Sequence, residues 1–169
     1  MKIAYKTIDH SEQIDSNKFS KINGIILSGG RGDPYGPLNL TSNFAALMNF
    51  NGPIIGFCLG HEIIAAAFGS SIEKLPKRQE RMQNILIEKN KDPIFNGIGK
   101  EMDIRKKHSN HVVDVPKDFR LLARSGICPV EAMRHKKKRI YSFQGHPEVS
   151  GEKGTIIMKN FLRMCGEKI

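Results

Sequence analysis

The stretch that decides the fold is PIIGFCLGHE, residues 53–62. Its first part, residues 53–57, is a short apolar run typical of a buried strand, and residues 59–68 continue as an apolar, alanine-rich helix that Gly69 ends. Cys58 stands at the junction, where a tight turn exposes the side chain and the start of a helix favours the thiolate. The stretch therefore predicts a reactive cysteine, with a small buried packing cysteine as the alternative.

A similar unit precedes this one. Residues 24–27 form another short apolar run, which ends in the glycine turn 28–30, and residues 31–38 hold two glycines and two prolines and are predicted to be a loop. A helix follows that Asn39 or Thr41 could cap. The remaining expectations for this half are a strand over residues 2–8, a short helix or loop over residues 11–22, and one helix face carrying Phe44, Leu47 and Met48.

Strand, helix, strand and helix in this order imply parallel pairing. After residue 70 the pattern changes to shorter alternating segments, which predict partly antiparallel strands joined by turns at residues 81–89, 101–106, 111–115, 120–124, 129–133 and 139–143. Ile157, Phe161, Met164 and Cys165 recur at helical spacing and predict a final helix that covers the sheet. The expected fold is α/β with a mostly parallel central sheet flanked by helices and additional antiparallel strands in the C-terminal half, built as one domain over residues 1–169.

Composition narrows the class further. The chain has 169 residues, 39% of them hydrophobic, and a formal net charge of +10. No apolar run reaches the length of a membrane span and the N-terminus lacks the apolar core of a signal peptide, so a cytoplasmic protein is expected. Of the three cysteines, Cys128 and Cys165 are expected to be packing residues.

Basic residues gather in three places, which are predicted to be a solvated or partner-facing surface. Residues 134–139 lie between two alternating segments, as the tip of a hairpin would. No aromatic residues interleave with the charges, which argues against nucleic-acid binding. The other members of these clusters are Lys74, Lys77, Arg78, Arg81, Arg105, Lys106 and Lys107.

Two further motifs complete a candidate site. A thiolate needs a base, and the base needs a group that orients it. In an extended FQGHPE segment, residues 143–148, His146 and Glu148 point to the same side, so the carboxylate can hold the imidazole in one tautomer. The backbone N–H groups of the 28–30 turn, together with that of Leu59, could form an oxyanion hole. A metal site made of the histidines of residues 108–111 with His61, His146 or Glu62 is disfavoured, because no cysteine pair or HExxH frame accompanies them.

The motifs ILSGGRGDP, PIIGFCLGHE and IYSFQGHPEVS together resemble the triad, or class I, glutamine amidotransferases. The C-terminal part is most similar to the glutaminase subunits and domains of the GMP synthetases. The resemblance implies that Cys58 is the nucleophile, His146 the general base and acid, and Glu148 its orienting carboxylate. It also implies oxyanion N–H groups at Gly30 and Leu59, and a glutamine-binding segment made of Asn110, His111, Val112 and Val113.

Three departures from the family pattern bear on activity. Glu62 replaces the usual glutamine that helps to bind the substrate, and an anion there would raise the pKa of Cys58 unless it pairs with the substrate ammonium. Arg31 replaces a proline at the mouth of the site, where its charge could balance Glu62. The family also has an additional strand and helix before the segment that corresponds to residues 2–8.

The resemblance implies a glutaminase subunit that needs no cofactor and delivers ammonia to a separate synthetase, with GMP synthetase as the first acceptor system. Two alternatives stay open. One is a hydrolase of another γ-glutamyl compound, in which Glu62 would recognise a different amine. The other is a non-catalytic relative with a binding or regulatory role.

Overall fold

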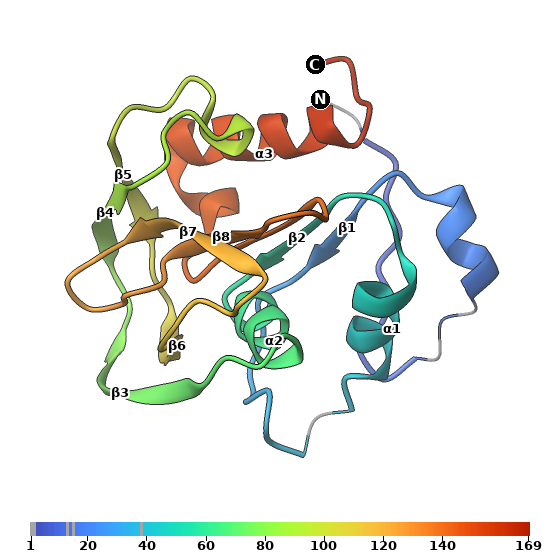
Figure 1. Cartoon of the computed structure of the whole chain (residues 1–169), viewed down its shortest axis with the longest axis horizontal. Coiled ribbons are helices and arrows are strands. Elements are labelled where there is room, and N and C mark those ends of the chain that lie inside the picture. The colour runs from blue at the N-terminus through green and yellow to red at the C-terminus, as the bar shows by residue number, and fades with distance from the viewer. Residues whose placement is uncertain (1–2, 13, 15, 38) are drawn as a thin grey trace.

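The computed structural model describes residues 3–12, 14, 16–37 and 39–169. Figure 1 shows a sheet with helices on both faces. The strands are β1 (Ile25–Leu27), β2 (Ile54–Phe57), β3 (Ile72–Gln79), β4 (Met82–Ile87), β5 (Glu101–Arg105), β6 (His108–Val112), β7 (Phe119–Arg124), β8 (Ala132–His135) and β9 (Ile140–Phe143). The helices are η1 (Ser16–Lys21), α1 (Thr41–Asn49), α2 (Leu59–Ala67), η2 (Pro93–Phe95), η3 (Pro147–Val149) and α3 (Gly151–Met164).

The main sheet has seven strands in the order β1-β2-β9-β8-β7-β4-β5. Parallel pairs join β1 to β2 and β2 to β9, and the other pairs are antiparallel. The α/β class and the antiparallel strands of the C-terminal half are therefore confirmed, although parallel pairing takes a smaller share of the sheet than expected. Residues 136–139 form the tip of the β8–β9 hairpin as predicted, whereas Arg134 and His135 of the same basic run lie in β8.

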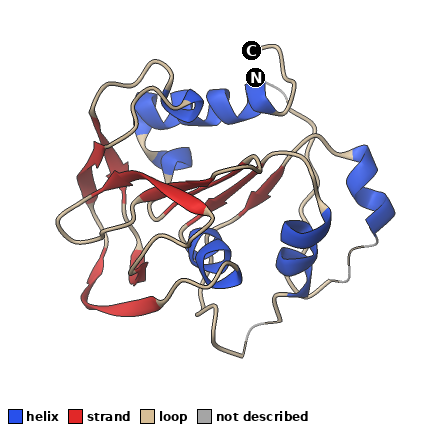
Figure 2. Ribbon diagram, viewed as in Figure 1, coloured by secondary structure: helices blue, strands red, loops and turns tan. Residues whose placement is uncertain are grey.

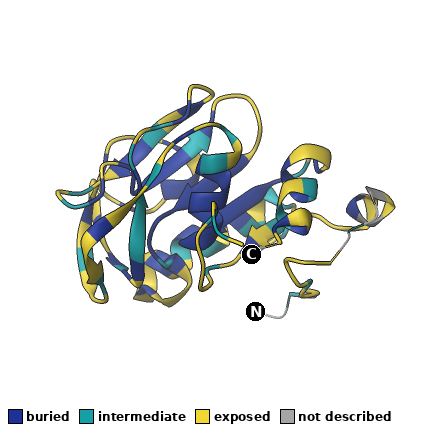
Figure 3. Cartoon of the chain, turned by 90° about the horizontal axis from the view of Figure 1, so that it is seen from below, coloured by how far each residue is buried: buried dark blue, intermediate teal, exposed yellow. Residues whose placement is uncertain are grey.

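Successive residues of β2 face opposite layers, because side chains alternate across a strand. Ile54 packs with α1 and α2 on one face, and Ile55 packs with α3 on the other; both side chains are fully buried. Figure 2 shows these helices on the two sides of the sheet, and Figure 3 shows the buried strands between exposed loops. This burial on both faces explains why residues 53–57 read as a continuous apolar run.

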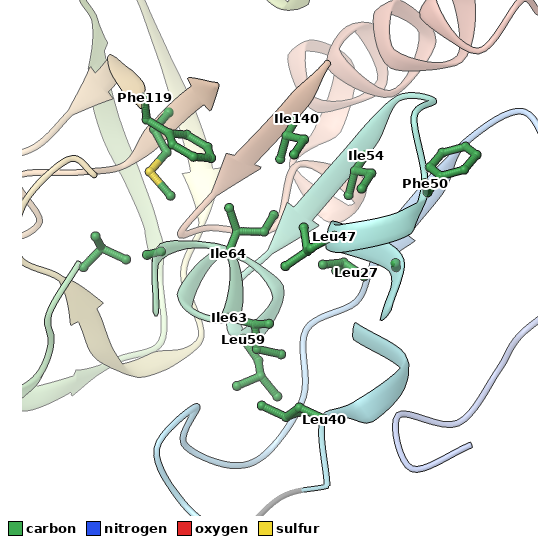
Figure 4. Close-up of a cluster of buried hydrophobic side chains, with 14 of the residues drawn as sticks. Leu27, Leu40, Leu47, Phe50, Ile54, Leu59, Ile63, Ile64, Phe119 and Ile140 are labelled. Carbon is green, nitrogen blue, oxygen red and sulfur yellow. The ribbon is translucent and has the colours of Figure 1, made fainter. Parts of the chain in front are cut away.

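Helix α1 packs through a different face from the one predicted. Ala46 and Leu47 are buried, whereas Phe44 is 41% exposed and Met48 is 75% exposed. The cluster in Figure 4 explains this, since Leu47 points toward Leu27 and Ile54. Only Leu47 of the three expected residues therefore belongs to the core face. Asn39 precedes the helix and accepts hydrogen bonds from the Thr41 N–H, at 3.1 Å, and from the Thr41 hydroxyl.

The N-terminal expectation was wrong. Residues 3–8 run irregularly and pair with no strand, and Lys2 lies outside the described residues. Alternation favours a strand only where a neighbouring strand supplies hydrogen-bond partners, and Tyr5 is 89% exposed. The helix or loop expected over residues 11–22 contains η1.

A second, two-stranded sheet pairs β3 with β6 in antiparallel register. Strand β3 was not expected, because four of its eight residues are charged and one is Pro76. Its partner β6 carries Asn110 and His111, so this small sheet places the expected glutamine-binding segment. None of the helices in the described part of the chain is long and apolar enough to cross a membrane.

Candidate active site

Cys58 occupies the turn between β2 and α2. Its backbone has φ 50° and ψ −107°, and it is the one residue other than glycine with a positive φ in the part of the chain that the structure describes. The Cys58 N–H donates to the carbonyl oxygen of Phe143 at 2.9 Å, which ties the turn to the end of β9. A backbone conformation that costs of order 1–3 kcal/mol is retained where the surroundings enforce it, and such residues cluster at functional sites.

Two glycines let the helix start immediately after this turn. A Cβ atom on Gly60 would lie 2.1 Å from the carbonyl oxygen of Leu27, and one on Gly56 would lie 2.6 Å from that of Gly60. Real Cβ atoms do not approach backbone so closely, so only glycine fits at either position. The strained turn is therefore built by the close approach of α2 to β1 and β2.

His146 and Glu148 come together as the sequence predicts. The Nδ1 atom of His146 lies 2.7 Å from Oε1 of Glu148 and donates to it, which leaves Nε2 free to act on a neighbour. The backbone of His146 is held on both sides: its N–H donates to the carbonyl oxygen of Arg105 at 2.9 Å, and its carbonyl oxygen accepts from the hydroxyl of Ser150. The imidazole is thus fixed in position and in tautomer.

Gly29 brings the cysteine and the histidine to one place. A Cβ atom on Gly29 would lie 2.7 Å from Cε1 of His146 and 3.4 Å from Cβ of Cys58. A Cβ on the next residue, Gly30, would lie 3.1 Å from the side chain of Leu59. The glycine turn after β1 therefore borders both the cysteine turn and the imidazole, and any side chain at Gly29 would displace the ring.

The surroundings of Cys58 oppose the thiolate, contrary to the prediction from the helix start. Cys58 is 5% exposed, and burial raises its pKa to about 12. The carboxyls of Glu62 and Glu148 raise this pKa as well, while the Leu59 N–H and the Lys106 ammonium lower it. Desolvation outweighs the helix terminus here. The S–H donates to the carbonyl oxygen of Lys107, with 3.7 Å between sulfur and oxygen.

Glu62 lies one helical turn after the cysteine, with its carboxyl buried. Its Oε1 accepts from Nε2 of Gln144 at 2.9 Å, and its side chain also bonds that of Asn110. Burial raises the pKa of Glu62 to about 7, the two hydrogen bonds lower it, and Asp33 raises it. Arg31 is exposed and forms no ion pair within the described ranges, so the expected charge balance with Glu62 is not made.

The four residues expected to bind glutamine have different surroundings. Asn110 contacts Glu62, whereas Nδ1 of His111 donates to the carbonyl oxygen of Glu73 at 3.1 Å. The side chain of Val112 is buried in the core, and the N–H of Val113 donates to Ser71 at 3.1 Å. Asn110 is thus the member of the segment whose side chain is hydrogen-bonded to Glu62, one helical turn after Cys58.

The sequence reasoning missed four contributors to this region. Gln144 lies inside the FQGHPE motif, and its amide is fully buried against Glu62. His108 donates from Nδ1 to the carbonyl oxygen of Asn110 at 2.7 Å, while its buried Nε2 has no hydrogen-bond partner among the residues that the structure describes. Lys106 and Lys107 were assigned to a solvated cluster, yet the side chain of Lys106 is fully buried. No sequence signal distinguishes Lys106 from its neighbours, because the burial depends on a partner 25 positions away.

His61 belongs to the packing behind the site. It is fully buried, its Nε2–H donates to the carbonyl oxygen of Val130 at 3.2 Å, and its Nδ1 accepts from the hydroxyl of Ser142 at 2.8 Å. Burial lowers its pKa to about 3, so the ring is neutral. Across the residues that the structure describes, no three His, Cys, Asp or Glu side chains are grouped to hold a metal ion.

The site thus combines a cysteine at a strand–helix turn, a neighbouring histidine–glutamate pair and the carboxyl ends of parallel strands, which is the arrangement typical of α/β proteins that use a nucleophile. A family model describes this combination. The chain belongs to the class-I glutamine amidotransferase family, whose model matches residues 1–165. The resemblance that the three motifs indicated is therefore confirmed.

Relatives of the family cover most of this chain. A glutamine-hydrolyzing GMP synthase subunit of Methanococcus aeolicus is 41% identical over 171 residues, which span 98% of this chain and 87% of the relative. The protein of the same description from Thermococcus kodakarensis is 39% identical over 167 residues, which span 96% and 86%. A solved structure described as a putative GMP synthase subunit, from Thermoplasma acidophilum, superposes with a TM-score of 0.83 at 32% identity, over 90% of this chain and 77% of that one.

Proposed function

We propose that this chain is the glutaminase subunit of a GMP synthase, and that Cys58, His146 and Glu148 are its catalytic triad. The observation that carries the proposal is the pairing of a strained cysteine turn with an oriented imidazole across Gly29. Family membership supports glutamine hydrolysis, and the relatives described above carry the name of a glutamine-hydrolyzing GMP synthase subunit. The product ammonia would pass to the partner synthetase subunit.

The reaction follows from the positions of these groups. Sγ of Cys58 attacks the side-chain carbonyl carbon of glutamine while Nε2 of His146 takes the thiol proton, which explains how a thiol of raised pKa reacts without a preformed thiolate. The oxyanion accepts hydrogen bonds from the N–H groups of Gly30 and Leu59. The carbon–nitrogen bond then breaks, and His146 returns the proton to the leaving ammonia.

The second half of the reaction releases glutamate. His146 takes a proton from water, the water oxygen attacks the γ-glutamyl thioester, and the sulfur leaves and recovers a proton from the imidazole. Glu148 stays hydrogen-bonded to Nδ1 and stabilises the imidazolium in both halves. Glu62, one helical turn after Cys58, is hydrogen-bonded to Asn110 and Gln144, and these three side chains would bind the amino acid part of the substrate.

Substitution of the nucleophile tests the assignment. Cys58→Ala should abolish glutamate release from glutamine in the presence of the partner synthetase and leave the thermal unfolding midpoint nearly unchanged, because alanine keeps the Cβ and removes only the sulfur. Cys128→Ala, which removes a buried thiol outside the proposed triad, is the control and should retain glutaminase activity. Glutamate release by folded Cys58→Ala at the wild-type rate would refute the proposal. A preference of the wild type for γ-glutamyl amines over glutamine would instead favour a different γ-glutamyl hydrolase.

A further inference from the structure

Segment 105–107 accepts hydrogen bonds from both Cys58, the proposed nucleophile, and His146, the proposed base. The carbonyl oxygen of Arg105 accepts the N–H of His146 at 2.9 Å. The carbonyl oxygen of Lys107, two residues later, accepts the S–H of Cys58. A shift of this short segment would therefore move the sulfur and the imidazole relative to each other.

Lys106, the residue between them, points into the protein. Its side chain is fully buried and forms an ion pair with Glu131, whose side chain is also fully buried. The N–H of Lys106 donates to the carbonyl oxygen of Arg81 at 2.8 Å. The middle of the segment is thus attached at its backbone and at its side chain.

Glu131 is in turn attached to the main sheet. Its N–H donates to the carbonyl oxygen of Ala123 in β7 at 2.9 Å, and Oε1 accepts from the Ser125 hydroxyl at 2.6 Å. Its carbonyl oxygen accepts the N–H of Gln144 at 2.8 Å, two residues before His146. The Lys106–Glu131 ion pair therefore connects segment 105–107, which holds the backbone of His146, to Glu131, which holds the backbone of Gln144.

The pair also places a positive charge near the thiol. Glu62 and Glu148 face Cys58 with carboxyls that oppose formation of the thiolate, and Lys106 favours it. The other titratable groups that feel the Lys106 charge are His61, His108 and Cys128. A buried ion pair seldom adds stability over well-packed apolar residues of the same size, so stability does not explain its presence at this position.

We propose that the Lys106–Glu131 pair is a positioning device of the active site, which fixes segment 105–107 and sets a buried positive charge opposite the carboxyls of Glu62 and Glu148. The proposal deepens the proposed function and rests on it, because positioning matters only if Cys58 and His146 act together. Lys106 and Glu131 act through the nucleophile and the base and are not themselves catalytic residues.

The test replaces the pair with apolar residues of similar size. The double variant Lys106→Met/Glu131→Leu removes both charges without leaving one unpaired, and thermal unfolding reports whether it folds. The readout is the rate of Cys58 alkylation by iodoacetamide as a function of pH, located by mass spectrometry, which requires neither glutamine nor the partner. We expect alkylation at pH 8 to be about tenfold slower, equivalent to a rise of about one unit in the thiol pKa. Glutaminase assays with the partner should show a similar fall in kcat and a KM within about twofold.

The matched control is a surface ion pair of the same type. Arg124→Met/Glu88→Leu removes a pair whose side chains are exposed, and it should leave the alkylation profile and kcat unchanged. A second variant, Lys106→Glu/Glu131→Lys, keeps two opposite charges but reverses their order, and it should slow alkylation more than the apolar variant does.

Wild-type alkylation and wild-type kcat in either folded variant would overturn the proposal. Failure of both variants to fold would also overturn it, since the pair would then be a requirement of the fold. The proposed function fails separately: wild-type protein that alkylates at Cys58 but releases no glutamate from glutamine with the partner present would contradict the glutaminase assignment, whatever the variants do.

Discussion

Glu62 shows how a single buried carboxyl changes the site. Where the related family pattern has an amide, this chain has an acid whose pKa is raised to about 7 by burial. Gln144 donates to its Oε1, a bond that a glutamine at position 62 could also accept. The ionisation of Glu62 therefore makes the stability of the protein depend on pH, while the hydrogen bond from Gln144 is one that either residue can accept.

Glu62→Gln should stabilise the protein in a pH-dependent way. The folded-state pKa of Glu62 lies above the ordinary value of 4.5, so its contribution to stability is fully present below pH 4.5 and is lost as the pH rises through about 7. We expect the variant to gain about 3 kcal/mol in the free energy of unfolding at pH 8 and almost nothing at pH 4.5. Urea denaturation at the two pH values measures this. Glu80→Gln, at an exposed carboxylate, is the control, and an equal gain of Glu62→Gln at both pH values would contradict the explanation.

At this scale the sequence predicts the residues that lie within one motif and misses those that depend on distant contacts. Cys58, His146 and Glu148 could be singled out because their spacing alone places them on turns after strands. The burial of Lys106 could not be inferred, since it needs Glu131, just before β8, to compensate the ammonium. For the pKa of Cys58, the increase caused by Glu62 was predicted, but the larger increase caused by burial was missed, because desolvation is not visible in the sequence.

Among the elements, α2 determines the geometry of the cysteine turn. Its first turn lies against the end of β1 because position 60 has no side chain. The sequence predicted α2 and α3 well, since their apolar residues recur over several turns and a glycine follows each helix, and it predicted β2 because the strand is a continuous apolar run. It predicted a strand at residues 3–8 that does not form, and it missed β3. A short strand depends on its pairing partner more than on its own residues.

Gly60→Ala should disturb this contact. The added Cβ would meet the Leu27 carbonyl oxygen at 2.1 Å, and neither β1 nor α2 can move without loosening the core. We expect a loss of about 3 kcal/mol in the free energy of unfolding, measured by urea denaturation, and a fall in glutaminase activity as Cys58 shifts. Gly126→Ala is the matched control, because its Cβ would meet nothing within 4 Å. Equal stabilities for the two variants would show that α2 does not rest on this contact.

At the scale of the whole molecule, two buried neutral histidines make stability depend on pH. They are His61 in α2 and His108 in β6. Burial lowers the pKa of His61 to about 3 and that of His108 to about 4, with the Lys106 charge acting in the same direction. Both values lie below the ordinary 6.5, so the stability that these groups provide is present above pH 6.5 and is lost as the pH falls toward 4 and 3. Acid therefore lowers the free energy of unfolding through these two buried rings.

His108→Asn should reduce this acid sensitivity. An asparagine amide can still donate to the carbonyl oxygen of Asn110 but binds no proton. Between pH 6 and 4.5, we expect the pH dependence of the unfolding free energy to fall by roughly 1.4 kcal/mol per pH unit, measured by urea denaturation across that range. His10→Asn, at an exposed ring, should leave the slope as it is in the wild type. An unchanged slope in His108→Asn would contradict the role of this buried ring.

The left-handed backbone of Cys58 places a limit on how this fold can change over time. At φ 50° glycine would be relaxed, and every other residue is strained. Under the proposed function, selection for the nucleophile would hold a side chain at position 58 in spite of this strain. In a descendant that no longer performs the reaction, a change from cysteine to glycine at position 58 would relieve the backbone strain. The gain in stability would then favour loss of the thiol and oppose its return.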